Sequence, residues 1–207
     1  MIFSLYIFKK CKTDELYKTQ MKGLKDNTIT SYNPMLISSI FKREFRENRQ
    51  EQEFIESYLE SAKIISKEVY RRQKNNMGVE KIFYSYSLVL PVVYLCRHSI
   101  ELAIKRAIRL LDGNIKFNHS LLKQWNSLRE YLNKYNISVK DRDLMNFMGE
   151  FINNIELLDD NGIKLRYPKQ QDNSYSQQEF LWVDTKNIVN QTELFIRQLE
   201  YIKIDKL

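Results

Sequence analysis

The stretch from Pro91 to Arg109, PVVYLCRHSIELAIKRAIR, constrains the fold more than any other part of the chain. Its apolar residues recur at helical spacing, so it predicts a long helix with one strongly apolar side. At about 100° per residue, the polar residues share an arc of about 120° on the opposite side. They are Tyr94, Arg97, His98, Glu101, Lys105 and Arg109. That arc is the candidate functional surface.

Two interpretations of this arc are open. Arg97–Glu101 and Glu101–Lys105 are i,i+4 pairs, which commonly run along a solvated helix face and contribute only about 0.2–0.5 kcal/mol each. An arginine, a histidine, a tyrosine, a carboxylate and a lysine on one arc are, however, a more varied set than solubility requires. The variety favours a functional site.

The scarcity of helix breakers extends the helical prediction to most of the chain. Only 5 glycines and 3 prolines occur in 207 residues. Apolar stripes predict further helices over residues 51–74 and 79–111, and from about residues 121, 141 and 185 onward. Because the links are short, we expect an all-α, antiparallel helical bundle. Pro91 lies inside the second of these helices, where it predicts a kink or a break.

Two segments fall outside the helical pattern. Residues 163–183, which contain LRYPKQQDNSYSQQEFLWV, predict a small extended or hairpin insertion. Residues 1–50 predict an N-terminal extension packed on the bundle, with a short amphipathic helix at 35–48, and residues 51–207 form the helical domain. The apolar start is too short to span a bilayer and lacks a signal cleavage site, so no membrane partner is expected.

The rest of the composition narrows the chemistry. There is no glycine-rich phosphate loop, no G-x-S-x-G turn and no zinc-ligand spacing, so neither a metal nor a cofactor is predicted. Asp159-Asp160 is either a polar helix stop or a cation ligand. Cys11 and Cys96 make no disulfide framework, which indicates the cytoplasm, and Cys96 is predicted to be buried. A net charge of +7 suits RNA or a nucleotide, but also an ordinary basic protein.

Three pieces together resemble a known family. They run from Pro91 to Lys105 with Arg97-His98 and Glu101 inside, from His119 to Trp125 as HSLLKQW, and through Arg166-Tyr167-Pro168. In this order they resemble a branch of the HEPN superfamily (higher eukaryotes and prokaryotes nucleotide-binding). The resemblance covers about residues 80–170 and implies a helical bundle of a prokaryotic toxin or defence system.

In many HEPN proteins the resemblance implies metal-independent RNA cleavage. Their motif is an arginine followed four to six residues later by a histidine, usually paired across a homodimer. Neither His98 nor His119 has an arginine at that spacing, so the standard motif is missing. Non-catalytic members serve as binding or assembly modules, with a partner protein or a second copy of the chain.

A nuclease reading of these residues has a physical basis. A base must take the 2′-hydroxyl proton and cations must stabilise the phosphorane. His98 or His119 is the candidate base or acid, and Glu101 would orient His98 or Arg97. The candidate phosphate or ligand contacts are Arg97, Lys105, Arg166, Tyr94 and Tyr167.

Each of these residues also has an ordinary structural interpretation. Arg97 and Lys105 could simply pair with Glu101, and His119 could cap its helix. Arg166-Tyr167-Pro168 could fix a loop on the bundle. Two hypotheses follow: a nucleotide- or RNA-binding or assembly module, and alternatively a metal-independent RNA endonuclease using His98 or His119. Both predict that the candidate residues lie near one another.

Overall fold

The computed structural model describes residues 47–75, 79–111, 119–135, 142–160, 162, 164–167, 169, 172–176 and 183–201. The chain divides into two units, Met1–Phe41 and Lys42–Leu207. Residues 1–46 of the extension predicted at 1–50 lie outside the described residues, and so do Cys11 and most of the helix expected at 35–48. The last four residues of that predicted extension belong to the first helix that the structure describes.

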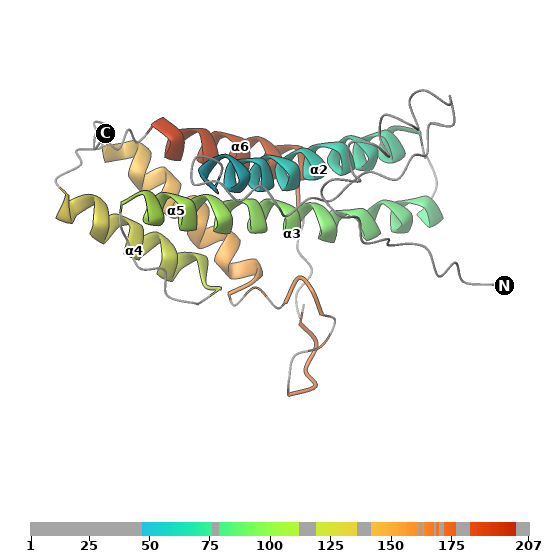
Figure 1. The fold of residues 1–207 in the computed structure, drawn as a ribbon. Coiled ribbons are helices and arrows are strands. Elements are labelled where there is room, and N and C mark those ends of the chain that lie inside the picture. Colours follow the sequence, from blue (N-terminus) through green and yellow to red (C-terminus); the bar gives the residue numbers. More distant parts are fainter. Residues whose placement is uncertain are drawn as a thin grey trace, which may run out of the picture. The chain divides into compact units, whose positions relative to one another are not determined.

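Five helices form the described part of this unit (Figure 1). They are α2 Glu47–Asn75, α3 Val79–Leu110, α4 Leu121–Lys134, α5 Arg142–Leu158 and α6 Thr185–Tyr201. α2 and α3 are joined by three residues and run antiparallel (Figure 1). α6 packs on both of them, and α4 packs against α3 and α5. The predicted all-α helical bundle is confirmed.

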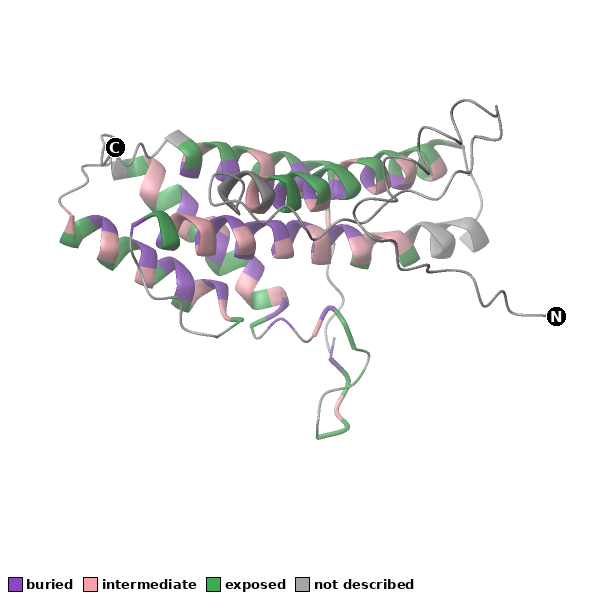
Figure 2. Cartoon of the chain, viewed as in Figure 1, coloured by how far each residue is buried: buried purple, intermediate pink, exposed green. Residues whose placement is uncertain are grey.

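α3 is the central helix because it contacts α2, α4 and α6. Figure 2 shows buried residues along much of its described length. The main core takes residues from every helix: Ile55 and Leu59 from α2, Ile100, Ile104 and Ile108 from α3, Trp125 and Leu128 from α4, Ile152 and Ile155 from α5, and Phe195 and Leu199 from α6. A second cluster joins Ala62, Val92, Cys96 and Val189. Cys96 is fully buried, as predicted, and burial raises the pKa of its thiol to about 11.

Of the kink or break expected at Pro91, the break does not occur. The helix is continuous from Val79 to Leu110, with Pro91 inside it. Proline removes one backbone hydrogen bond from a helix. Here the next two residues, Val92 and Val93, are buried, and Val92 packs with Ala62 of α2. Packing of this part of α3 against α2 and α6 therefore keeps the helix continuous.

Side chains cap two of the helices at their N-termini. Ser120 is the N-cap of α4, since its Oγ accepts a hydrogen bond from the backbone N of Lys123 at 3.3 Å. Asp184 does the same for α6, with its Oδ1 accepting from the backbone N of Asn187 at 2.9 Å. Ser and Asp are among the residues preferred at helix N-caps, because their side-chain oxygens accept from free backbone N–H groups of the first turn.

The insertion between α5 and α6 contains one antiparallel bridge, between Lys169 and Tyr175. Asp172 Oδ1 accepts hydrogen bonds from the backbone N and the Oγ of Ser174 at 2.9 and 2.6 Å. Asn173 between them has φ of 66°, a conformation that asparagine tolerates. The described part of the insertion is therefore a tight hairpin-like turn.

Within the described residues, Ser87–Leu110 of α3 is long and apolar enough to cross a membrane by length and composition alone. Half of its most apolar window is buried inside the bundle. The same segment carries Arg97 and Glu101, which pair with each other in the interior at 3.1 Å. These properties are those of a core helix that other helices cover.

Candidate functional site

Arg97 lies at the centre of a buried polar cluster. Its side chain is 3% exposed, and its donors reach three parts of the chain. Nη1 donates to Glu101 Oε2 at 3.1 Å, Nε to the backbone carbonyl of Asp159 at 3.1 Å, and Nη2 to the backbone carbonyl of His119 at 2.5 Å. Arg97 therefore ties α3 to the start of α4 and to the end of α5.

Asp159 completes the charge balance around Arg97. It is fully buried, and its Oδ2 lies 3.3 Å from Arg97 Nε. The single Nε proton is directed to the carbonyl of Asp159, so Oδ2 has the charge of Arg97 nearby but no hydrogen bond from the described residues. Its Oδ1 accepts from the backbone N of Lys164 at 3.1 Å, which fixes the turn after α5.

Asp159 directly follows the last residue of α5, as the helix-stop interpretation expected. That interpretation did not include its burial against Arg97. A signal was nevertheless present, because Ile152, Ile155 and Asp159 continue one helical stripe at spacings of three and four residues. An acid at a core position needs a buried cation, and Arg97 provides it.

Gly162 packs directly against Arg97 and His119 of the buried cluster. Its φ is +74°, and a Cβ at this position would lie 3.2 Å from both Arg97 Nη1 and His119 Cβ. Glycine is thus favoured by the left-handed backbone and by the close approach of two side chains. Arg166 Nε donates to the carbonyl of Gly162, which places Arg166 beside the same cluster.

Glu101 joins the buried cluster to the surface. Its side chain is 4% exposed, and Oε1 accepts from Lys105 Nζ at 2.6 Å and lies 3.0 Å from His119 Nδ1. Burial alone would raise the pKa of Glu101. The hydrogen bond and charge of Lys105, the contact with His119 and the charge of Arg97 outweigh burial and lower that pKa below its ordinary value. Glu101 is therefore a buried, ionised carboxylate.

His119 is the exposed member of this group. Its side chain is 59% exposed, although Nδ1 is held on Glu101. It precedes the N-cap of α4, where Glu156 accepts from Ser120 Oγ and, through Oε2, from the backbone N of Leu121 at 2.9 Å. The capping role considered for His119 thus belongs to Ser120 and Glu156. The imidazole is left facing solvent, oriented by a carboxylate.

His98 lies in a different environment from His119. It is half-buried on α3, with Tyr58 of α2 edge-on at 4.6 Å and Tyr94 stacked nearly parallel at 5.8 Å between ring centroids. Burial lowers the pKa of His98; the charges of Lys105, Arg166 and Arg97 lower it further, while Glu101 opposes them. His98 is therefore held in its neutral form at pH 7.

The predicted set is brought together only in part. Direct contacts join Arg97, Glu101, Lys105 and His119. Arg166 reaches them through Gly162, and Tyr167 follows it with 57% exposure. His98 and Tyr94 form a separate aromatic group, and Arg109 pairs with Glu51 of α2 at 2.6 Å.

The solvated-face interpretation of the polar arc was wrong at its centre. Both i,i+4 pairs are present, Arg97–Glu101 at 3.1 Å and Glu101–Lys105 at 2.6 Å. Arg97 and Glu101 are buried, however, because the starts of α4 and of the segment after α5 cover them. In the described ranges, no group of three or more His, Cys, Asp or Glu side chains could hold a metal ion.

The fold and the cluster define a helical bundle with an exposed histidine held on a buried carboxylate. The sequence matches the HEPN domain over residues 67–199, more than half of the chain. The chain therefore belongs to the HEPN family, and this membership supports a nucleotide- or RNA-related role in general. No curated protein and no solved structure matches it.

Proposed function

We propose that this chain is a nucleotide- or RNA-binding module, with phosphate held by Lys105, His119 and Arg166. The observation that carries the proposal is the shared carboxylate. Glu101 Oε1 contacts both Lys105 Nζ, at 2.6 Å, and His119 Nδ1, at 3.0 Å. One buried acid thus orients two nitrogen groups at the edge of the cluster.

The charge balance supports an anionic ligand. Inside the cluster, Arg97 and Lys105 offset Glu101 and Asp159. Arg166 lies next to them, is exposed, and donates through Nε to a neutral carbonyl. Because the cluster itself is balanced, Arg166 makes this edge net positive, which favours a phosphate. An arginine can also donate two parallel hydrogen bonds to a phosphate.

Arg97 has a positioning role in this proposal. All three of its nitrogens already donate to the protein, so no phosphate contact is assigned to it. It holds the backbone of His119 and the carboxylate of Glu101, and through them sets where the exposed imidazole lies.

Binding can be measured by fluorescence anisotropy with a labelled single-stranded oligoribonucleotide in EDTA. We expect Arg166→Ala and His119→Ala to weaken binding by about tenfold each, since a charge-assisted hydrogen bond is worth about 1.5–3 kcal/mol. Arg129→Ala, which removes an exposed arginine of α4, is the charge-matched control and should change affinity little. Equal losses in all three variants would show only a non-specific effect of net charge and would contradict the site.

A second candidate is a metal-independent ribonuclease in which His119 acts as acid or base. A histidine held on a carboxylate has the geometry of a general base with its orienting group. The same preparations should be incubated with RNA in EDTA, with wild type compared against His119→Ala and His98→Ala. Loss of cleavage in His119→Ala alone would favour catalysis by this cluster. No cleavage by any of them would leave the binding module.

From family membership, we also infer the location and the partners of the protein. It would be a cytoplasmic protein of a prokaryotic defence or toxin-type system, acting as a homodimer or with a partner protein. Light scattering after size-exclusion chromatography tests the homodimer, and a monomer at all concentrations would count against it.

A further inference from the structure

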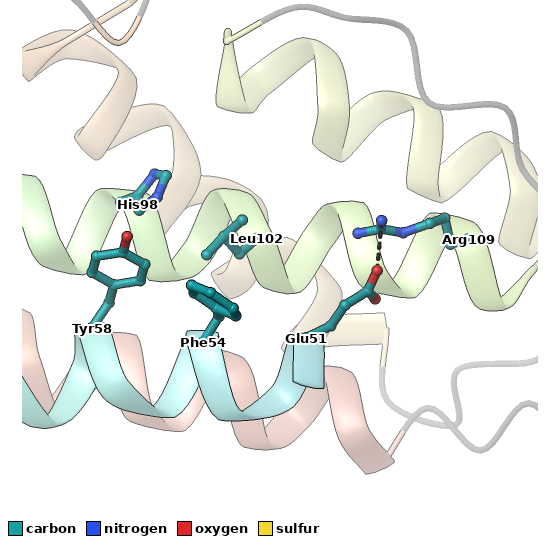
Figure 3. Close-up of a pocket in the computed structure, with 6 residues that line it drawn as sticks. All are labelled: Glu51, Phe54, Tyr58, His98, Leu102 and Arg109. Carbon is teal, nitrogen blue, oxygen red and sulfur yellow. Dashed lines mark ion pairs between the residues drawn. The ribbon is translucent and has the colours of Figure 1, made fainter. Parts of the chain in front are cut away.

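A pocket lies between α2 and α3, and none of its lining residues belongs to the buried cluster (Figure 3). Its volume is about 360 Å³, and it is partly open to solvent. It is lined by Glu51, Phe54, Tyr58, His98, Leu102 and Arg109. Pockets for small ligands have volumes of about 300–1,000 Å³, so this one is sized for a single small group.

Aromatic and apolar side chains form most of the wall. Phe54 is 48% exposed and lies beside Tyr58 on α2, opposite Leu102 on α3 (Figure 3). His98 is fixed by its edge contact with Tyr58 and by the ring of Tyr94. Burial also keeps the pKa of His98 low, so the wall presents a neutral ring. These surfaces suit stacking against a flat heterocycle.

The far end of the pocket is polar. Arg109 Nη1 pairs with Glu51 Oε1 at 2.6 Å (Figure 3). An arginine has five N–H donors, and a carboxylate can accept more than one hydrogen bond. This end can therefore both donate to and accept from the edge of a ligand. Nucleobases have donors and acceptors side by side along one edge.

The pocket adjoins the proposed phosphate site. His98, Leu102, Lys105 and Arg109 follow one another on α3 at spacings of four, three and four residues, so they lie along one stripe of the helix. Leu102 in the pocket is one turn from Lys105. A ring in the pocket and a phosphate at Lys105 could therefore belong to one nucleotide or to neighbouring nucleotides of a strand.

We propose that the pocket between α2 and α3 binds an unpaired nucleobase, from single-stranded RNA or from a free nucleotide, whose phosphate is held near Lys105 and His119. The inference rests on the proposed function and makes it more specific, because a base inside a duplex cannot enter the pocket. The site should discriminate single strands from duplexes and nucleotides from sugar phosphates.

The test uses two probes with the full chain. The first is a single-stranded oligoribonucleotide containing one 2-aminopurine, whose fluorescence falls when the base stacks. The second is adenosine monophosphate, compared with ribose 5-phosphate by calorimetry. Phe54→Ala removes a half-exposed stacking face, and Leu102→Trp fills the pocket. Tyr70→Ala truncates another exposed aromatic of α2, 63% exposed and outside the pocket, and is the matched control.

We expect Phe54→Ala and Leu102→Trp to weaken strand binding by about tenfold and to abolish the quenching, since one base stacked on an aromatic side chain contributes about 1–3 kcal/mol. Tyr70→Ala should match wild type. Binding of adenosine monophosphate in preference to ribose 5-phosphate would identify the free nucleotide as a ligand. Binding of the strand alone would identify RNA. Either result supports the pocket when Phe54→Ala and Leu102→Trp also show the expected loss.

Two results would overturn the inference. If wild type binds the strand and Phe54→Ala and Leu102→Trp bind it equally well, the pocket takes no base, while the phosphate site at Lys105 and His119 remains. If wild type binds neither probe, both the pocket and the proposed function fail. Phe54 is exposed, so its variant should fold even where Leu102→Trp does not.

Discussion

Arg97 and His98 are adjacent on α3, yet they belong to two regions that differ in solvent exposure and in the contacts they make. The first region is a closed charge cluster, in which Arg97 is 2% exposed and its nitrogens all donate to protein groups. The second is an open aromatic pocket, in which His98 is half-buried and contacts rings. A helix turns by about 100° per residue, which is enough to direct one residue inward and the next toward a groove. α3 therefore carries a buried charge cluster and an aromatic-lined pocket on different sides.

The largest expected effect is in the charge cluster. Arg97→Met should lower the free energy of unfolding by about 3–5 kcal/mol, because it leaves the carboxylate of Asp159 buried without its cation and leaves Glu101 with Lys105 alone. Urea denaturation measures this effect. Arg129→Ala, at an exposed position, is the control. A loss below about 1 kcal/mol would mean that the cluster is solvated, and the comparison of the two regions would fail.

A smaller effect is expected at Gly162, which packs against the charge cluster. Gly162→Ala should cost about 1–3 kcal/mol, because φ is +74° and the new Cβ would press on Arg97 and His119 at 3.2 Å. Gly149→Ala is the matched control, since its Cβ would meet only Trp125 Nε1 at 3.3 Å, at an ordinary helical φ. Thermal unfolding of the two variants should separate them. Equal melting temperatures would contradict the packing assigned to Gly162.

The smallest effect concerns the pH dependence of the pocket. The pKa of His98 is lowered from 6.5, chiefly by burial. As the pH falls below 6.5, the unfolded chain binds the proton before the folded one, so stability decreases until the folded pKa is passed. His98→Gln should flatten this part of a melting-temperature profile between pH 8 and 5. The pKa of Glu101 is lowered from 4.5, so its contribution is lost only below pH 4.5. A His98→Gln profile that is parallel to wild type throughout would count against a buried, neutral His98.

Periodicity predicted the helices well because each apolar stripe is a local property of the sequence. The starts of α4 and α6, the ends of α2 and α3 and the hairpin-like insertion all follow from spacing and turn residues close in the chain. Pro91 was the exception. Its local preference for a break was overcome by packing of Val92 and Val93, which no local pattern reports.

The candidate site was predicted less well because its contacts are not local. The polar arc included Glu101 and Lys105, which are in contact in the structure. It could not tell that segments 22 and 62 residues further on would bury Arg97. Glu51, Phe54 and Tyr58 were missed as pocket residues, since only the pairing of α2 with α3 brings them to His98. Asp159 had a detectable signal, an acid on a core stripe, and Gly162 had none.

The cap of α4 bears on how a phosphate could approach His119. The first turn of a helix carries a partial positive charge and free N–H groups, and it commonly binds anions. At α4 this position is already taken, because Glu156 accepts from Ser120 Oγ and from the backbone N of Leu121. The helix end next to His119 is thus electrostatically satisfied by the protein's own carboxylate. A second anion would be repelled there, so a phosphate in the proposed site would approach His119 from the side of Lys105 and Arg166.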